Sequence, residues 1–367
     1  MTRIGIDCRL AGQEHAGIGR YTQNLVQRLV LNKDINWVLF FSNSTQAREI
    51  LPQKLDHVKE VITPIRHYSL LEQIKLPLIF AKEKLDLLHV PHFNVPIFYQ
   101  GKIVVTIHDL LWHEQRGSHV TTLPAWKYRL KYWGYTETVK KAVEKAAKIF
   151  VPSTTVAATL AKYYPKAKDK TIVTYEGVEQ TYLDHEIKEK PRKKQLVYTG
   201  SLYPHKNIKV VFQALQKLPD FSLKLVGSRN VFQDNTKTLV KNYKLTNQVE
   251  FLGKLSDKDL IKLYEESFAL VFPSFSEGFG LPGLEAMAVG LSVIASDIPI
   301  FREIYKNAAA YFNPLSSAEL LETIHALNSS RKFLTKAGKD RVKSFSWDKM
   351  TDKTFKIYQQ VLKQNHA

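Results

Sequence analysis

Short runs of β-branched and apolar residues alternate with helical patterns along the whole chain. The run Ile103–Ile107 is apolar on both of its faces, which is typical of a strand buried inside a parallel sheet. Strands that alternate with helices form βαβ units, so we predict an α/β protein with doubly wound parallel sheets. The ten predicted strands are Arg3–Cys8, Trp37–Ser42, Leu87–Val90, Lys102–Ile107, Lys148–Val151, Gln195–Thr199, Ser222–Val226, Val249–Leu252, Ala269–Phe272 and Ser292–Ala295.

A charged stretch without hydrophobic periodicity divides this pattern into two similar halves. It ends at residue 194, and a fresh strand pattern begins at Gln195. A chain of 367 residues is long enough for two domains. The last helix carries an apolar stripe at three- and four-residue spacing. We therefore predict an N-terminal domain over 1–178, a linker over 179–194, a second domain over 195–345 and a C-terminal helix over 346–367.

The net charge of +18 is the main anomaly of composition. A basic chain suits nucleic acid, an anionic membrane surface or anionic substrates. No recognised nucleic-acid-binding module is present, so no nucleic acid partner is expected. Cys8 is the only cysteine, which excludes a disulfide within this chain and fits a reducing compartment. The N-terminus is typical of a strand and not of a signal peptide, so we expect a cytoplasmic protein.

The stretch Trp126–Trp133 mixes aromatic and basic residues, and further lysines follow at positions 140, 141, 145 and 148. As a helix it would be amphipathic, with rings and cations suited to an anionic lipid interface. The alternative is a solvated basic helix whose aromatic rings face the core. The first alternative predicts peripheral contact with the inner face of the cell membrane.

The strand Ala269–Phe272 runs into a glycine-rich turn, and Pro282 stands where the next helix would begin. Gly278 and Gly280 have no side chains, so the backbone at these positions can come close to another group. Proline at the first helical position loses an N–H that would have no partner anyway. The remaining free amides and the positive helix end predict a phosphate site.

Two carboxylates, Glu277 and Glu285, flank this turn and are separated by seven residues. Paired carboxylates also occur in glycoside hydrolases, but hydrolysis does not need a glycine-rich helix start beside them. A sugar nucleotide needs both features, because its hydroxyls need acceptors and its pyrophosphate needs amides. The segment therefore favours a sugar-nucleotide site.

Other candidate residues follow other strands, at the sheet edge where open α/β sheets bind ligands. Gly17 and Gly19 follow the first strand, but the third glycine of a dinucleotide fingerprint is missing, and a tight turn is the alternative. His108 ends a strand and could bind a sugar hydroxyl or shuttle a proton; the alternative is a core histidine. Lys206 precedes Asn207, a candidate helix N-cap, and would lie near an anion; the alternative is a surface lysine.

His89 and His92 also lie at a strand end. Metal ligation is one possible role of these histidines, and a structural role in the core is the other. No carboxylate or cysteine completes a recognisable ligand set, so no metal site is predicted.

These residues resemble the retaining glycosyltransferases of family 4, which have the GT-B fold of two Rossmann-like domains facing a central cleft. The resemblance spans nearly the whole chain, and Glu277–Glu285 is its most specific part. The opening segment Arg3–Leu10 is similar to the mannosyl- and rhamnosyltransferase branch of bacterial polysaccharide synthesis. Supporting matches are Gly17–Gly19, Ile107–Asp109, Gly200–Asn207, Ser296–Asp297 and Arg302–Glu303.

The resemblance implies a role for each matching position. Glu277 would contact hydroxyls of the donor sugar near the reacting carbon, and Glu285 would bind the ribose. Lys206 would neutralise the departing diphosphate, and His108 would lie near the donor sugar. The C-terminal helix would cross back to the first domain. The other donor-binding residues would be Gly17, Gly19, Ser201, His205, Leu252, Gly278, Phe279, Gly280 and Leu281.

One departure from the family pattern concerns the cations beside the diphosphate. Many members have an arginine where Ser201 stands, and some have one where His205 stands. Lys206 would then act with less cationic help, or Arg229 would substitute.

The implied activity is retaining transfer of a hexose, with GDP-mannose as the first choice of donor, to a hydroxyl of a glycan or lipid-linked acceptor. The reaction would serve cell-surface polysaccharide synthesis. No cofactor and no metal are expected, because helix amides and a lysine would hold the diphosphate. A sugar-nucleotide epimerase or phosphorylase on the same fold is the alternative enzyme. A basic nucleic-acid-binding protein is the alternative of another class.

Overall fold

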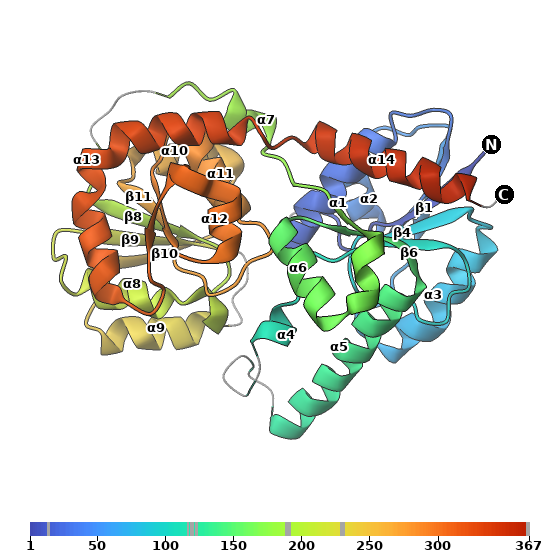
Figure 1. Ribbon diagram of the computed structural model, residues 1–367, viewed down its shortest axis with the longest axis horizontal. Coiled ribbons are helices and arrows are strands. Elements are labelled where there is room, and N and C mark those ends of the chain that lie inside the picture. The colour runs from blue at the N-terminus through green and yellow to red at the C-terminus, as the bar shows by residue number, and fades with distance from the viewer. Residues whose placement is uncertain are drawn as a thin grey trace. The chain divides into compact units, whose positions relative to one another are not determined.

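The computed structural model describes residues 1–12, 15–115, 117, 121, 124–187, 192–227 and 232–364. The chain divides into two compact units, and each is described by itself. Unit 1 comprises Met1–Trp112, Leu123–Glu176 and Trp347–Ala367; unit 2 comprises His113–Thr122 and Gly177–Ser346. The predicted linker, 179–194, lies in unit 2. Figure 1 shows the α/β architecture of both units.

Unit 1 contains a seven-stranded sheet in which every pair of neighbouring strands is parallel. The strand order is β3-β2-β1-β4-β5-β6-β7, so the winding direction reverses between β1 and β4. The strands are β1 (Arg3–Asp7), β2 (Asn36–Phe41), β3 (Val58–Ile62), β4 (Leu87–Val90), β5 (Ile103–Thr106), β6 (Ala146–Val151) and β7 (Thr171–Val173).

The helices of unit 1 cover its sheet. They are α1 (Ala16–Leu29), α2 (Ser44–Ile50), α3 (Leu70–Lys82), α5 (Ala125–Lys145), α6 (Thr154–Tyr163), the 3₁₀ helix η3 (Pro165–Lys170) and α14 (Trp347–Lys363). The short helix α4 (Leu111–Glu114) has its first two residues in unit 1 and its last two in unit 2. Helices α3 and α5 contribute to one hydrophobic core cluster. Helix α14 packs against α1 and β6, and its apolar stripe is buried as its spacing predicted. No helix in the described part of the chain is long and apolar enough to cross a membrane.

Unit 2 contains a six-stranded parallel sheet of order β10-β9-β8-β11-β12-β13, which reverses between β8 and β11. Its strands are β8 (Gln195–Thr199), β9 (Ser222–Val226), β10 (Val249–Gly253), β11 (Ala269–Phe272), β12 (Val293–Ser296) and β13 (Ala309–Phe312). Its helices are α7 (Gln180–Leu183), η4 (Pro204–Lys206), α8 (Ile208–Leu215), α9 (Gln233–Asn242), α10 (Asp257–Glu266), α11 (Leu281–Ala288), α12 (Pro299–Tyr305), η5 (Lys306–Ala308) and α13 (Ser317–Val342).

All ten predicted strands are present, with ends within two residues of the prediction, so the predicted doubly wound α/β class is confirmed. Three strands were not predicted: β3, β7 and β13. Each is the edge strand of its sheet. The residues of β3 and β7 are exposed or partly exposed, so these strands lack the two-faced apolar run of a central strand. The four residues of β13 are apolar, but only Ala309 and Phe312 are buried.

Candidate active site

The winding reversal of unit 2 lies between β8 and β11, and this is where doubly wound sheets bind ligands. The segment Gly200–Asn207 follows β8, and the segment Pro273–Gly280 follows β11. The fold therefore brings the predicted Lys206 and Glu277 to the same end of neighbouring strands. Leu252 lies at an irregularity near the same end of β10, which is the edge strand of this sheet.

Lys206 and Glu277 form a direct ion pair. Lys206 Nζ lies 2.5 Å from Glu277 Oε1, and Ser274 Oγ donates to the same oxygen at 2.7 Å. The two charged side chains are 15% and 12% exposed, so they are largely withdrawn from water but still reachable. Glu277 Oε2 makes no hydrogen bond to the described residues. The site thus offers an unused carboxylate oxygen and an ammonium group that has two further N–H donors.

The start of α11 has the predicted geometry. Gly280 precedes the helix with φ of +99°, a left-handed conformation that favours glycine, and Pro282 lies in the first turn. The amides of Gly280 and Leu281 have no acceptor among the described residues, because the first helical amides lack intrahelical partners. A second cause for Gly280 was not predicted: a Cβ there would lie 2.4 Å from the hydroxyl of Tyr305.

The other glutamate of the motif is more deeply placed. Glu285 lies in α11 and is 3% exposed. The side chains of Phe279 and Leu281 are also buried, and Phe279 packs edge-on against Phe345 at 5.4 Å. These side chains carry no polar group, so the backbone atoms of Phe279 and Leu281 are the ones that could hydrogen-bond to a ligand. Gly278 lies in the same loop before α11.

The segment after β8 is held by its own contacts. The carbonyl of Ser201 accepts a hydrogen bond from the Tyr198 hydroxyl, and the carbonyl of His205 accepts one from the amide of Phe275 at 2.8 Å. Burial, and then the charge of Lys206, lower the pKa of His205 to about 3, so its imidazole is neutral. Asn207 occupies the N-cap position of α8 as predicted, but its side chain makes no capping hydrogen bond. Its side chain instead donates to the carbonyls of Pro273 and Pro314. Arg229 lies outside the described residues.

In unit 1 the two predicted glycines differ. A Cβ on Gly19 would lie 1.8 Å from the carbonyl oxygen of Gly12, so Gly19 is required for a tight turn. Gly17, in the first turn of α1, is exposed and has nothing within 4 Å of the Cβ position. Gly17 therefore has the geometry for close approach of a ligand, whereas Gly19 has a packing role.

His108 follows β5 and is buried with both ring nitrogens occupied. Nε2 donates to the carbonyl of Pro91 at 3.1 Å, and Nδ1 lies 3.4 Å from Glu176 Oε1. The ring also packs edge-on against Tyr21. Glu176 was not predicted to belong to a site. Its signal was weak, because it follows the unpredicted edge strand β7 at the start of a charged stretch.

His89 and His92 have structural partners. His89 Nε2 lies 2.8 Å from Thr106 Oγ1, and Nδ1 contacts the hydroxyl of Tyr358 in α14. His92 Nδ1 accepts from the amide of Asn94 at 3.2 Å. Burial, and then the proximity of His108, lower the pKa of both histidines to about 3. In the described part of the chain, no three histidine, cysteine or acidic residues are grouped to hold a metal ion.

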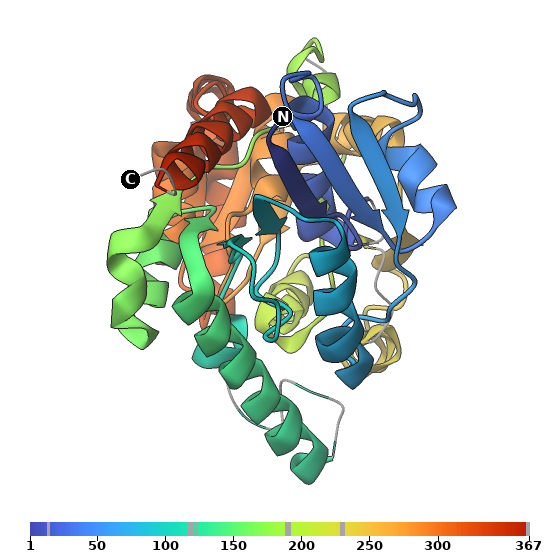
Figure 2. The same ribbon diagram turned by 90° about the vertical axis from the view of Figure 1, so that its right-hand side faces the viewer.

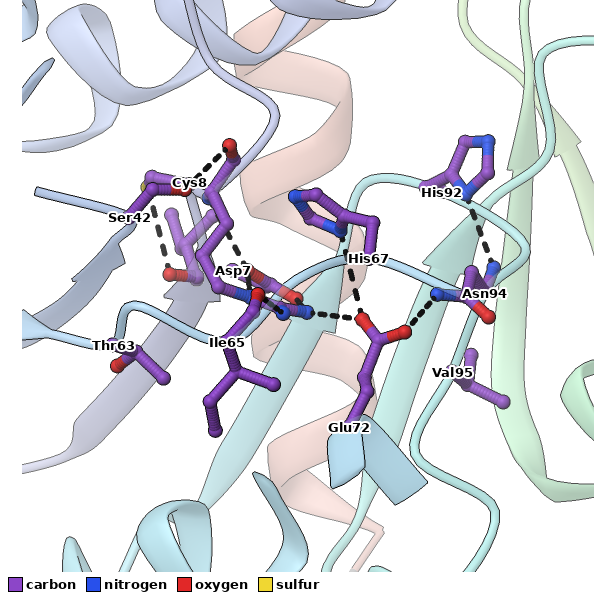
Figure 3. Close-up of polar contacts among 12 residues, drawn as sticks. Asp7, Cys8, Ser42, Thr63, Ile65, His67, Glu72, His92, Asn94 and Val95 are labelled. Atoms are coloured by element: carbon purple, nitrogen blue, oxygen red, sulfur yellow. Dashed lines mark hydrogen bonds and ion pairs between the residues drawn. The ribbon is translucent and has the colours of Figure 1, made fainter. Parts of the chain in front are cut away.

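A buried ionic network lies at the winding reversal of unit 1, between the ends of β1 and β4 (Figure 3). Arg9 binds both oxygens of Asp7, at 2.8 and 2.7 Å, and donates to Glu72 Oε1 at 2.8 Å. Asn94 Nδ2 and the amide of Tyr68 donate to the other Glu72 oxygen, each at 2.7 Å. Burial alone would raise the pKa of Asp7, but the charge and hydrogen bonds of Arg9 outweigh it and lower that pKa.

This network was also missed from the sequence. Its signal was the pair Asp7 and Arg9 directly after an apolar strand, and nothing in the sequence linked it to Glu72 in α3. The network borders a cavity of about 10 Å³, the size of one water molecule. Its lining residues are Asp7, Arg9, Leu10, His67, Val90, Pro91, His92 and Asn94.

Two doubly wound parallel units in one chain are the architecture of the GT-B glycosyltransferases. The model of Glycosyltransferase Family 4 matches residues 15–182, and that of Glycosyl transferases group 1 matches residues 180–341. The chain therefore belongs to the family 4 glycosyltransferases, as its motifs indicated. It is a glycosyltransferase related to enzymes of O-antigen synthesis.

Two related proteins and one solved structure give the context. The O-antigen chain mannosyltransferase RfbU of Salmonella typhimurium is 29% identical over 67% of this chain and 65% of its own length. The O-antigen chain mannosyltransferase B of Escherichia coli is 27% identical over 93% of this chain and 95% of its own. Anabaena HepE, solved in complex with UDP-glucose, superposes with a TM-score of 0.75 at 15% identity, covering 98% of this chain and all of the other.

Proposed function

We propose that this protein transfers a hexose from a nucleotide diphosphate sugar to a hydroxyl of a glycan or lipid-linked acceptor, with retention at the anomeric carbon. The observation that carries the proposal is the Lys206–Glu277 pair beside the start of α11. A cation and unpaired amides suit a diphosphate, and an adjacent carboxylate suits sugar hydroxyls. The product would enter cell-surface polysaccharide synthesis, as the names of the related O-antigen enzymes suggest.

In the proposed reaction, the bond between the anomeric carbon and the diphosphate oxygen breaks while the acceptor oxygen bonds to the same face of that carbon. The acceptor proton passes to the leaving diphosphate. Lys206 and the amides of Gly280 and Leu281 stabilise the charge that develops on the diphosphate. Because these groups supply that stabilisation, the proposal requires no metal and no other cofactor.

The remaining site residues are proposed to position and recognise the donor. Glu277 Oε2 accepts hydrogen bonds from donor-sugar hydroxyls, and Glu285 binds the ribose. The backbone of Ser201, His205, Gly278 and Phe279, with Leu252, completes the nucleotide contacts in unit 2. Both nitrogens of His108 face protein groups, so we propose that His108 shapes the wall beside the donor sugar and does not shuttle protons. Gly17, and not Gly19, is the proposed unit 1 contact with the donor.

The donor is proposed to be GDP-mannose, because both related O-antigen enzymes are named mannosyltransferases. The structural neighbour HepE was solved with UDP-glucose, which makes UDP-sugars the main competitor. A thermal-shift screen of GDP-, UDP- and dTDP-sugars separates them, since a ligand that binds the folded state raises its melting temperature. A larger shift with a UDP- or dTDP-sugar than with GDP-mannose would exclude the proposed donor.

The roles of the ion pair are tested with Glu277→Gln and Lys206→Met. Each variant should lower kcat about 100-fold or more, because each removes charge from a preorganised site. The matched control is Lys193→Met, which breaks an ion pair of the same 2.5 Å length with Glu266 on the exposed surface of unit 2. The control should keep full transfer. Transfer by both site variants within about twofold of wild type would contradict the proposed mechanism.

A further inference from the structure

Large apolar side chains are exposed along one side of α3. Leu70 is 85% exposed and Leu78 is 68% exposed, and Leu71 and Ile74 are more than half exposed. Residues spaced by four lie on one side of a helix, so these positions form a continuous stripe. The opposite side of α3 is also apolar, and its Leu76 and Phe80 lie in the core of unit 1. Core packing therefore accounts for one side of this helix and leaves the other unexplained.

Helix α5 has a similar exposed stripe at its N-terminal end. Trp126 and Trp133 are 65% and 63% exposed, and Leu130 lies between them on the same side. The alternative in which the aromatic rings of this helix face the core is therefore wrong for these two tryptophans. The buried side chains of α5 are Val139, Ala142 and Val143, all in its C-terminal half. Figures 1 and 2 both show the N-terminal end of α5 extending beyond the sheet of unit 1.

Helices α3 and α5 lie on the same side of the unit 1 sheet, because buried side chains of both belong to one core cluster. The segment 93–99 lies between the two helices: Gln73 of α3 bonds to Val95 and Ile97, and Lys145 at the C-terminal end of α5 donates to the carbonyls of Ile97 and Tyr99. Phe98, within this segment, is also more than half exposed. We call this surface the α3–α5 face; its exposed apolar residues are Leu70, Leu71, Ile74, Leu78, Phe98, Trp126, Leu130 and Trp133.

The charges on this face are mostly positive. The first nine residues of α5, Ala125–Trp133, contain three cations and no acid. The two helices contain three acids: Glu72 of α3 is buried against Arg9, Glu144 of α5 is paired with Lys141, and Glu137 is the third. The cations of the two helices are Lys75, Lys82, Lys127, Arg129, Lys131, Lys140, Lys141 and Lys145.

We propose that the α3–α5 face binds an anionic lipid bilayer, with the apolar side chains inserted among the headgroups and the cations against lipid phosphates. Tryptophan together with lysine and arginine is typical of membrane-surface helices. Protein–protein interfaces are instead depleted in lysine, which argues against a second copy as the occupant. The proposal rests on the proposed function in one respect: a lipid-linked acceptor would explain why the protein binds a membrane, because the acceptor would be presented at such a surface. It extends the sequence-based expectation for α5 to α3 and Phe98.

Vesicle flotation of the full chain tests the proposal. The probes are vesicles of phosphatidylcholine alone and vesicles that also contain phosphatidylglycerol. The variants are Leu70→Ser with Leu78→Ser on α3, and Trp126→Ser with Trp133→Ser on α5. The matched control is Leu315→Ser with Phe333→Ser, two exposed apolar residues of unit 2. Wild type and control should float with anionic vesicles in low salt, and each α3 or α5 variant should bind about tenfold more weakly.

Three results would overturn the proposal: equal binding to neutral vesicles, unchanged binding of the α3 variant, or a wild-type dimer that both variants convert to a monomer. Donor consumption with a water-soluble acceptor is measured in parallel. Flotation without transfer would contradict the proposed function alone. Transfer without flotation would contradict the membrane proposal alone.

Discussion

At the scale of single residues, the most informative position is Gly280. Its φ of +99° is costly for any other residue, and its missing Cβ makes room for Tyr305. The sequence showed that a glycine was needed near the helix start but not why. Tyr305 lies 25 residues away in the chain and donates to the carbonyl of Gly280 at 2.5 Å. A contact between segments so far apart leaves no local signal.

Gly280→Ala should therefore destabilise unit 2 by about 1–3 kcal/mol through backbone strain and the clash with Tyr305. Adding Tyr305→Phe should recover part of this loss, because the nearest clashing atom is the tyrosine hydroxyl. Urea unfolding followed by far-UV circular dichroism measures both effects. Gly17→Ala is the control, because nothing lies within 4 Å of its Cβ position. A larger loss for Gly17→Ala than for Gly280→Ala would contradict this account.

The buried histidine His89 gives a prediction for pH. Its pKa is about 3 in the folded protein, against a usual value of 6.5. The unfolded chain therefore binds the proton first as pH falls, so stability should decrease from about pH 6.5 towards pH 3. His89→Asn should reduce that slope by up to about 1.4 kcal/mol per pH unit.

Tryptophan fluorescence is the suitable probe for His89, because all five tryptophans belong to unit 1. Measurements above about pH 5 avoid Asp7 and Glu72, whose lowered pKa values remove stability only at lower pH. Identical slopes for wild type and His89→Asn in this range would show that His89 does not titrate on unfolding.

At the scale of elements, the sequence predicted every central strand but, of the four edge strands, only β10. A central parallel strand is buried on both faces and so must be a short apolar run, as in Ala269–Phe272. The edge strand β3 consists of exposed and partly exposed residues, including Lys59 and Glu60, and has no such signature. The polar network of Arg9 and Glu72 escaped prediction for a related reason. Its members are brought together by the sheet and not by spacing along the chain.

Helix α14 should be held in unit 1 by its apolar stripe and not by its ion pair. Met350 is buried, whereas the Arg28–Asp348 pair is largely exposed, with Asp348 76% exposed. Met350→Ala should cost about 2–5 kcal/mol, and Asp348→Asn less than about 1 kcal/mol. Chemical unfolding followed by tryptophan fluorescence compares them. The reverse order of the two losses would contradict this ranking.

At the scale of the whole molecule, the class of fold followed from the alternation of strands and helices, and the family followed from Glu277, Glu285 and their glycines. Two of these predictions are confirmed: the chain is a family 4 glycosyltransferase, and it contains two doubly wound units. The donor could not be derived from the sequence, because base and sugar recognition depend on the shapes of loops that connect the strands.

Donor binding should protect a defined part of the chain from hydrogen exchange. With GDP-mannose present, the segments 200–207 and 273–285 should exchange more slowly, because ligand binding lowers the population of locally opened states. Mass spectrometry of peptides with and without the nucleotide sugar locates the protection. The Lys206→Met variant should show less protection at the same concentration. Protection confined to other segments would move the donor site away from the start of α11.

Helix α14 also has a consequence for synthesis on the ribosome. Unit 1 contains the first part of the chain, yet Trp347 and Tyr358 of α14, which pack against Tyr21 and His89, are among its last residues. Unit 2, which precedes this helix in the chain, therefore emerges before unit 1 can be completed. Until α14 has been synthesised, the sheet of unit 1 exposes the apolar side chains that this helix later covers. A chaperone can therefore bind this surface while the ribosome is still translating unit 2.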